Sequence, residues 1–180
     1  MKTKEKDKIL LLVFDFDGTI ADTREMYYTF ITSSLKSRGY TLNKDKSRII
    51  RTMGSKLRVV LKNLGVKQKD IKPITDEIRK AVYSRIKKIR LCVSIADLRK
   101  LSKEHKMILL SNSNSRFLKK AASILKIKKY FLKVLGAEDF SKKEITIRQL
   151  IKKYRLNKNS VFYIADRASD VAIARKAGVR

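Results

Sequence analysis

The sequence predicts an α/β protein in which a parallel sheet is interrupted once by a helical segment. In the second half of the chain, short apolar runs alternate with helical patterns of about ten residues, which is typical of strand–helix–strand crossovers. The stretch from 22 to 90 shows helical patterns and no convincing strand. We therefore expect residues 1–21 and 91–180 to form a Rossmann-like core, with residues 22–90 inserted as a helical cap after the first strand.

The first strand and the cap account for the first half of the chain. The strand is the apolar run from Ile9 to Phe14, whose continuous hydrophobicity is typical of a strand that is covered on both faces. Apolar residues at helical spacing then predict four helices, at 22–37, 43–53, 55–64 and about 74–90. Glycines and one proline separate these helices.

The second half alternates regularly. Helices are expected at 95–104, 115–125, 143–154 and 168–177. The strands between them are expected at 107–110, 133–136 and 161–165, and the one at 133–136 carries the weakest pattern. Each strand is short and apolar, so we expect the sheet to be buried between two layers of helices.

Composition narrows the class of protein. The 180 residues carry 45 Lys+Arg against 17 Asp+Glu, a net charge of +28, and 43% are hydrophobic, which argues against a disordered chain. The single Cys92 excludes an internal disulfide framework and fits a reducing compartment. The run 9–14 is too short to span a bilayer, and residues 1–8 lead into no signal-peptide pattern. We expect a cytoplasmic protein with no membrane contact.

Polar and ionisable residues are concentrated where the expected strands end. They are Asp15 and Asp17, Ser111 and Asn112, Lys142 and Lys143, and Asp166 and Asp170. The carboxyl ends of parallel strands border one crevice, so these side chains are expected to converge there.

The expected cluster has a definite chemistry. Four carboxylates repel one another unless they are protonated or share a divalent cation, and oxygen ligands favour Mg²⁺, which commonly accompanies a phosphate. A serine and a lysine suit the phosphate oxygens. A free aspartate can attack phosphorus to form an aspartyl-phosphate, and a second aspartate can serve as general acid and base.

These residues resemble the four motifs of the haloacid dehalogenase-like hydrolase superfamily. Residues 15–23, DFDGTIADT, resemble the first motif, and residues 109–112, LLSN, the second. Lys142 or Lys143 resembles the third motif, and residues 164–170, IADRASD, the fourth. The motifs occur in the order of the family and span nearly the whole chain.

The resemblance implies a role for each acid. Asp15 would be the nucleophile and a metal ligand. Asp17 would be the general acid and base and would offer its backbone carbonyl to the metal, while Asp166 and Asp170 would complete the Mg²⁺ site. The founding dehalogenases lack a carboxylate at the place of Asp17, so its presence favours phosphatase or phosphomutase chemistry.

The resemblance also implies how the phosphoryl group is held. Ser111 would hydrogen-bond it, Asn112 would help to position the substrate, and Gly18 and Thr19 belong to the phosphate-binding part of the first motif. For the third motif Lys142 is preferred over Lys143, because Ile145 then lies three residues on, as in the family pattern.

The expected cap is similar to that of the C1-capped branch, which contains phosphoglycolate phosphatase and β-phosphoglucomutase. Residues 50–58, IRTMGSKLR, resemble the segment with which such caps reach over the active site. Arg51, Lys56 and Arg58 are therefore candidates for binding a distal anionic group of the substrate.

The hypothesis with most support is a Mg²⁺-dependent phosphatase acting on a small phosphorylated metabolite. Phosphomutase activity through the same intermediate is an alternative, as is a nucleic-acid-associated role, which only the +28 charge favours. The sequence does not establish the oligomeric state. It also does not establish whether the chain is complete, because relatives generally continue beyond the position of residue 180 into another strand and helix.

Overall fold

The structure, a computed structural model, describes residues 10–42 and 45–180. Within them the core is a four-stranded parallel sheet with the strand order β5 (Lys133–Leu135), β4 (Lys106–Leu110), β1 (Leu11–Phe14) and β6 (Val161–Ile164). In the register of the sheet, Leu11 lies opposite Lys106 and Val161. The predicted α/β class and parallel sheet are confirmed, and Ile9, expected in the first strand, lies outside the described residues.

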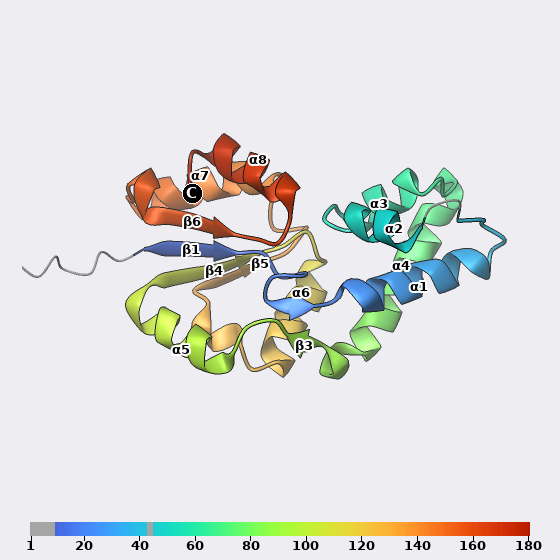
Figure 1. Cartoon of the computed structure of the whole chain (residues 1–180), viewed down its shortest axis with the longest axis horizontal. Helices are drawn as coiled ribbons and strands as arrows, with labels where there is room; N and C mark the ends of the chain where they lie inside the picture. The colour runs from blue at the N-terminus through green and yellow to red at the C-terminus, as the bar shows by residue number, and fades with distance from the viewer. Residues whose placement is uncertain (1–9, 43–44) are drawn as a thin grey trace, which may run out of the picture.

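Helices cover both faces of the sheet (Figure 1). Leu12 and Phe14 pack on one face in a cluster that includes residues of α5 (Ile95–Glu104) and α6 (Ser115–Ile124). Leu11 and Val13 point to the other face, toward α7 (Lys143–Lys153) and α8 (Ala168–Ala177). Successive side chains of a strand alternate between the faces, and both are buried here, which explains why β1 is continuously apolar.

The remaining four α-helices lie beyond the carboxyl ends of the sheet strands and are called the cap helices below (Figure 1). They are α1 (Arg24–Lys36), α2 (Lys46–Thr52), α3 (Leu57–Asn63) and α4 (Gln68–Ser84). Two short strands that the sequence did not indicate, β2 (Ala21–Asp22) and β3 (Arg90–Leu91), pair antiparallel where the chain leaves and re-enters the core. They hold the two ends of the cap segment side by side.

The last cap helix differs most from expectation. A helix was expected from about 74 to 90, but α4 begins at Gln68 and contains Pro73. Its inward face, which includes Ile71, Ile74 and Ile78, is buried. Burial of this face outweighs the hydrogen bond that the exposed proline cannot make. The helix ends at Ser84.

The remaining differences are small. A helix was expected at 43–53, but α2 begins at Lys46, where the Asp45 side chain caps it by accepting a hydrogen bond from the Arg48 backbone N–H at 2.7 Å. Residues 43–44 of that prediction lie outside the described residues. The described part of the chain also contains three short 3₁₀ helices, at Ile86–Lys88, Lys128–Tyr130 and Lys158–Ser160. Among the described residues, no helix is long and apolar enough to cross a membrane.

Candidate active site

The loop after β1 places two aspartates at the carboxyl edge of the sheet. The Asp15 backbone N–H donates to the Ile164 carbonyl at 2.9 Å, which ties the end of β1 to β6. Gly18 then turns with φ +82°, and a Cβ there would lie 2.5 Å from a carboxylate oxygen of Asp166. Only glycine permits both the left-handed backbone and this approach. The motif therefore needs glycine for the shape of the loop. The hydroxyl of Thr19 is buried and has no hydrogen-bond partner among the described residues.

Asp15 is a buried carboxylate beside a buried lysine. Its side chain accepts a hydrogen bond from the Phe16 backbone N–H at 2.8 Å, and its other oxygen lies 3.0 Å from Nζ of Lys143. Only 5% of Asp15 and 4% of Lys143 are exposed to solvent. Burial raises the pKa of Asp15 to about 6, against the lowering effect of Lys143, and nearby Asp17 adds to the rise. A further positive charge beside Asp15 would therefore favour its ionised form.

Lys143, rather than the preferred Lys142, reaches Asp15. Lys142 is exposed and occupies the N-cap position of α7, whereas Lys143 is the first residue of that helix. Lys143 shares the buried face of α7 with Ile147 and Ile151, which pack against the sheet, while Ile145 is only partly buried. The preference for Lys142 followed the family pattern, in which a hydrophobic residue lies three positions after the lysine, but in the structure Lys143, the alternative, contacts Asp15.

The Lys143 ammonium is held by a tyrosine that the sequence did not single out. The Tyr163 hydroxyl accepts a hydrogen bond from Lys143 Nζ at 2.7 Å and donates one to Asp170 at 2.9 Å. Burial raises the pKa of Tyr163 far above its usual range, with the carboxylates of Asp15 and Asp170 adding to the effect. The phenol therefore stays protonated and links the lysine to the fourth motif.

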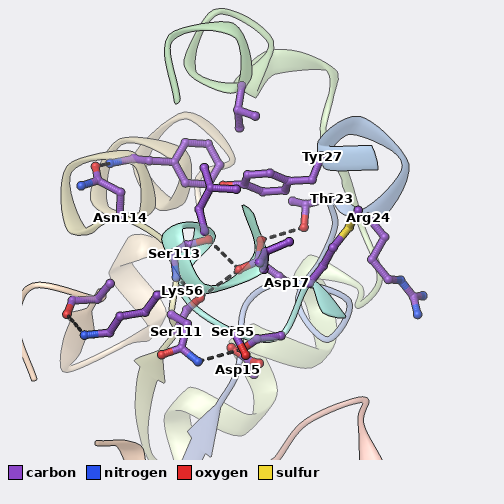
Figure 2. A pocket seen from close by; sticks show the side chains of 18 of the residues that line it. Asp15, Asp17, Thr23, Arg24, Tyr27, Ser55, Lys56, Ser111, Ser113 and Asn114 are labelled. Carbon is purple, nitrogen blue, oxygen red and sulfur yellow. Dashed lines mark hydrogen bonds between the residues drawn. The ribbon is translucent and has the colours of Figure 1, made fainter. Parts of the chain in front are cut away.

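Asp17 is bound by three hydroxyl groups. One carboxylate oxygen accepts from Thr23 at 2.7 Å, and the other accepts from Ser111 at 2.9 Å and Ser113 at 2.7 Å (Figure 2). Ser111 is fully buried at the end of β4, so the second motif lies directly against the first. Thr23 and Ser113 were not predicted, and their role depends on contacts that sequence spacing does not reveal.

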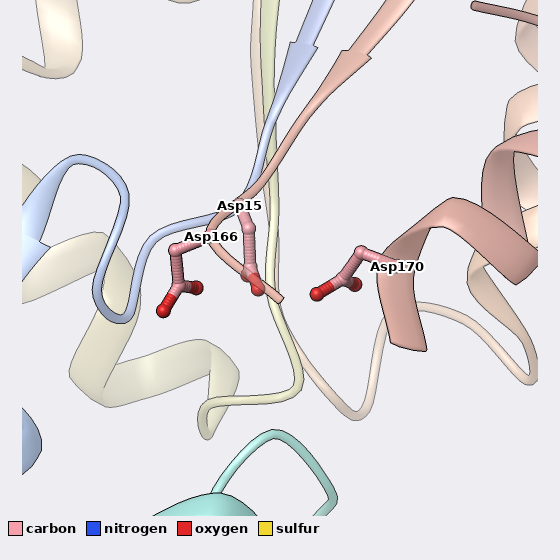
Figure 3. Close-up of side chains that lie close together, drawn as sticks. All are labelled: Asp15, Asp166 and Asp170. Atoms are coloured by element: carbon pink, nitrogen blue, oxygen red, sulfur yellow. The ribbon is translucent and has the colours of Figure 1, made fainter. Parts of the chain in front are cut away.

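Three acids could hold a cation. Asp15, Asp166 and Asp170 each offer a carboxylate oxygen, and these oxygens lie within 4.8 Å of one another (Figure 3). They come from the end of β1, the loop after β6 and the first turn of α8. The second oxygen of Asp170 is buried and has no hydrogen-bond partner in the described structure. An all-oxygen set with an unpaired buried carboxylate oxygen suits a hard divalent cation. The Asp17 side chain is not part of this set.

Two predicted residues join the cap helices to the core. The Asn112 side-chain amide donates to the Gly54 carbonyl at 2.8 Å, and Lys56 Nζ donates to the Ala137 carbonyl at 2.9 Å. Lys56 was a candidate for binding the substrate. In this structure its ammonium group interacts with that backbone carbonyl and with the ring of Phe140, whose centroid is 5.7 Å away.

The two candidate arginines lie at the periphery. Arg58 lines the cavity between cap and core and is exposed. Arg51 is exposed and donates to Ser47 Oγ at 3.2 Å. The structure therefore does not bring Arg51 to the aspartates.

Arg167, which sequence reasoning missed, fastens the cap to the fourth motif. It directly follows Asp166, and its guanidinium donates to the Ile50 carbonyl at 3.1 Å and to the Arg51 carbonyl. Its side chain fills the space beside Gly54, where a Cβ would lie 1.7 Å from a guanidinium nitrogen. The glycine is thus required for this contact.

A cavity of about 300 Å³ lies between the aspartates and the cap helices (Figure 2). Asp15, Asp17, Ser111, Asn112 and Asp166 line its floor. The rest of the lining mixes apolar side chains, such as Tyr27 and Phe117, with basic ones, such as Arg58 and Arg79. The arrangement therefore leaves carboxylates and hydroxyls facing a space that is large enough for a small molecule.

Known proteins share both sequence and fold with this chain. The family described as “Haloacid dehalogenase-like hydrolase” matches residues 12–180. A curated relative from Caldanaerobacter subterraneus subsp. tengcongensis, named “Putative pyrophosphatase PpaX”, is 26% identical over 178 residues, covering 96% of this chain and 80% of the relative.

Solved structures of other proteins have the same architecture as this chain. A haloacid dehalogenase-like family hydrolase of Streptococcus pneumoniae has a TM-score of 0.78 at 23% identity, covering 96% of this chain and 82% of that one. A Lactobacillus plantarum protein described as “putative phosphoglycolate phosphatase” has a TM-score of 0.80 at 18% identity, covering 96% and 84%. These likenesses show the fold. Because the family match spans nearly the whole sequence, we conclude that the chain belongs to the haloacid dehalogenase-like hydrolase family.

Proposed function

We propose that this protein is a Mg²⁺-dependent phosphatase that hydrolyses a small phosphate monoester through an aspartyl-phosphate on Asp15. The observation that carries the proposal is the buried Asp15 carboxylate, which lies 3.0 Å from Lys143 and within 4.8 Å of the carboxylates of Asp166 and Asp170. The similarity to proteins named “Putative pyrophosphatase PpaX” and “putative phosphoglycolate phosphatase” supports phosphoryl chemistry.

The first half of the reaction transfers the phosphoryl group to the enzyme. A carboxylate oxygen of Asp15 attacks phosphorus, and the bond between phosphorus and the ester oxygen breaks. Asp17, protonated for this step, gives its proton to the departing alkoxide. The hydroxyls of Thr23, Ser111 and Ser113 keep the Asp17 carboxylate in place.

The second half restores the enzyme. Asp17, now ionised, takes a proton from water as that water attacks phosphorus, which releases inorganic phosphate and the free Asp15 carboxylate. The Lys143 charge offsets the negative charge of the transferring group. Tyr163 positions Lys143 for this task. Ser111 would donate to a phosphoryl oxygen once its hydroxyl turns away from Asp17, and Thr19 is proposed as a further donor.

Asp15, Asp166 and Asp170 would hold the Mg²⁺ ion, since their oxygens converge and one buried oxygen of Asp170 has no partner in the described structure. When bound, Mg²⁺ supplies positive charge that stabilises the phosphoryl oxygens. The backbone carbonyl of Asp17 is proposed as a further ligand.

We also propose that residues 22–90 act as a cap over the substrate and that the protein works in the cytoplasm. The contacts of Asn112, Lys56 and Arg167 with backbone carbonyls support the first proposal, because they enclose a cavity above Asp15. The cavity of about 300 Å³ favours a small substrate over a nucleic-acid chain. The single Cys92 is consistent with a reducing compartment.

Chelation of divalent cations is expected to abolish phosphate release, and added Mg²⁺ to restore it. Binding of Mg²⁺ should also be detectable in the absence of substrate, as a rise in Tm. Mg²⁺ at about 100 times its Kd stabilises the folded state by about 2.7 kcal/mol, which raises Tm by roughly 5–10 °C for a chain of this size. A thermal melt with and without MgCl₂ measures this shift.

A matched pair of variants tests whether the cluster of Asp15, Asp166 and Asp170 causes the Mg²⁺-dependent rise in Tm. Asp166→Asn should lose the Mg²⁺-dependent rise in Tm. Asp76→Asn should keep it, because Asp76 lies on the exposed side of α4, paired with Lys72. Full activity in EDTA, or an equal Tm shift in both variants, would contradict the proposed metal site.

A further inference from the structure

The cavity above Asp15 has two unlike halves. The floor is polar and carries the aspartates and Ser111. Above the floor, one part of the wall is apolar and consists of Phe117 of α6 with Tyr27, Ile31, Met53, Val60 and Val82 of the segment 22–90, while basic residues line other parts of the cavity. Ile31, Val60 and Val82 are almost completely buried, so the wall continues the hydrophobic core of the cap.

Aromatic side chains give this wall a fixed shape. The rings of Tyr27 and Phe117 lie edge to face at 6.4 Å between centroids, and Phe117 packs in the same way on Phe16 at 6.2 Å. Figure 2 shows Tyr27 above Ser113 and Asp17. Burial raises the pKa of the Tyr27 phenol well above its usual range, so it presents a neutral ring to the cavity.

The cations around the cavity are mostly engaged. Lys56 donates to the Ala137 carbonyl and Arg167 to carbonyls of α2. Arg79 lies 3.4 Å from Glu138, and Arg24 lies 3.4 Å from Asp166. Arg58 is exposed. A second anionic group on the substrate would therefore have to compete with existing partners for four of these five cations, whereas an apolar group would meet the wall formed by Tyr27, Val60, Val82 and Phe117.

We propose that the substrate is a phosphate monoester whose alcohol part is a compact apolar group, seated against Tyr27, Val60, Val82 and Phe117 while the phosphate lies on the aspartate floor. This inference rests on the proposed phosphatase function. It separates this protein's substrate from pyrophosphate and phosphoglycolate, which carry negative charge at both ends.

Alkylphosphonates test the inference without requiring hydrolysis. They keep the phosphoryl head group, and titration calorimetry on the Mg²⁺-loaded protein would compare the methyl, propyl and pentyl compounds. Affinity is expected to rise about three- to fourfold per added methylene until the cavity is full, with increasingly negative heat capacity change. Phosphonoacetate, which resembles the propyl compound in size but carries a second charge, is expected to bind more weakly than propylphosphonate.

Two neighbouring valines of α3 provide a matched pair. Val60→Thr places a hydroxyl in the wall and should reduce the gain in affinity from methyl- to pentylphosphonate. Val59→Thr makes the same change at a side chain that is 45% exposed and outside the cavity lining, so it should leave that gain unchanged.

The outcomes separate the inference from the function. Equal affinity for all chain lengths, or tighter binding of phosphonoacetate, would overturn the apolar subsite even if the enzyme hydrolyses other phosphate esters. Affinity that rises with chain length supports the subsite. In that case, failure to hydrolyse the corresponding alkyl phosphates would contradict the proposed phosphatase function alone.

Discussion

Asp15→Asn is expected to reduce phosphate release by at least about a thousandfold, because an amide oxygen cannot act as the nucleophile that the proposed intermediate requires. The variant should fold. Asp15 is buried, and the uncharged amide avoids the cost of burying a negative charge, although Lys143 loses its ionic partner 3.0 Å away. Initial rates with an alkyl phosphate and MgCl₂ would measure the effect.

The control for this experiment is the same substitution on the surface. Asp76→Asn removes an exposed carboxylate of α4 whose pairing with Lys72 contributes little, so its rate should match that of the unmodified protein. If Asp15→Asn retained more than about a tenth of the rate while its melting curve stayed normal, a nucleophilic role for Asp15 would be excluded.

Lys143→Met is expected to lower kcat by about a hundred- to a thousandfold, the loss typical when one donor that stabilises transition-state charge is removed. The change also removes the cation beside Asp15, whose pKa of about 6 is held down by Lys143. The pKa of Asp15 should therefore rise further, and in the absence of Mg²⁺ the carboxyl of the variant should ionise only at higher pH.

Lys142→Met is the matched control, since Lys142 is adjacent in sequence but exposed. Its kcat should be close to that of the unmodified protein. Melting curves for both variants would show whether loss of activity merely follows unfolding. Loss of activity in Lys142→Met with normal rates in Lys143→Met would restore Lys142 as the third-motif lysine.

The central strands of the core could be predicted from sequence because β1 and β4 are short apolar runs that are buried on both faces. The residues 107–110 were expected as a strand, and β4 spans Lys106–Leu110. The strands β2 and β3 could not be predicted, since each has two residues and forms only by pairing across the cap segment. The start of α4 was misplaced because Pro73 was treated as a boundary, whereas the buried face that begins at Ile71 carries the helix through it.

The motif residues of the site could be anticipated because each follows a strand at the same edge of the sheet. Asp15, Ser111 and Asp166 are examples, and the structure places them around one cavity. The partners of these residues could not be anticipated. Tyr163 reaches Lys143 from within β6, and Arg167 contacts a helix that is more than a hundred residues away in the sequence. Such contacts depend on how strands and helices pack, and no local pattern encodes them.

The structure also shows how the charged residues behind the net charge of +28 are distributed. Two of the acids, Asp15 and Asp170, are buried at the proposed metal site, whereas exposed lysines and arginines are spread over the helices. A positive surface around an acidic, cation-binding cluster would attract a phosphate ester while leaving the cluster to bind Mg²⁺.

Trapping the phosphorylated enzyme tests the central claim most directly. The protein would be mixed with excess substrate and MgCl₂, quenched in acid during turnover, digested and examined by mass spectrometry. We expect the peptide that contains Asp15 to gain the mass of one phosphoryl group. With an aryl phosphate, whose leaving group departs without a proton from Asp17, we expect Asp17→Asn to accumulate more of this peptide because hydrolysis of the intermediate is slowed. Rapid phosphate release with that peptide unmodified at every quench time, in both proteins, would contradict the account.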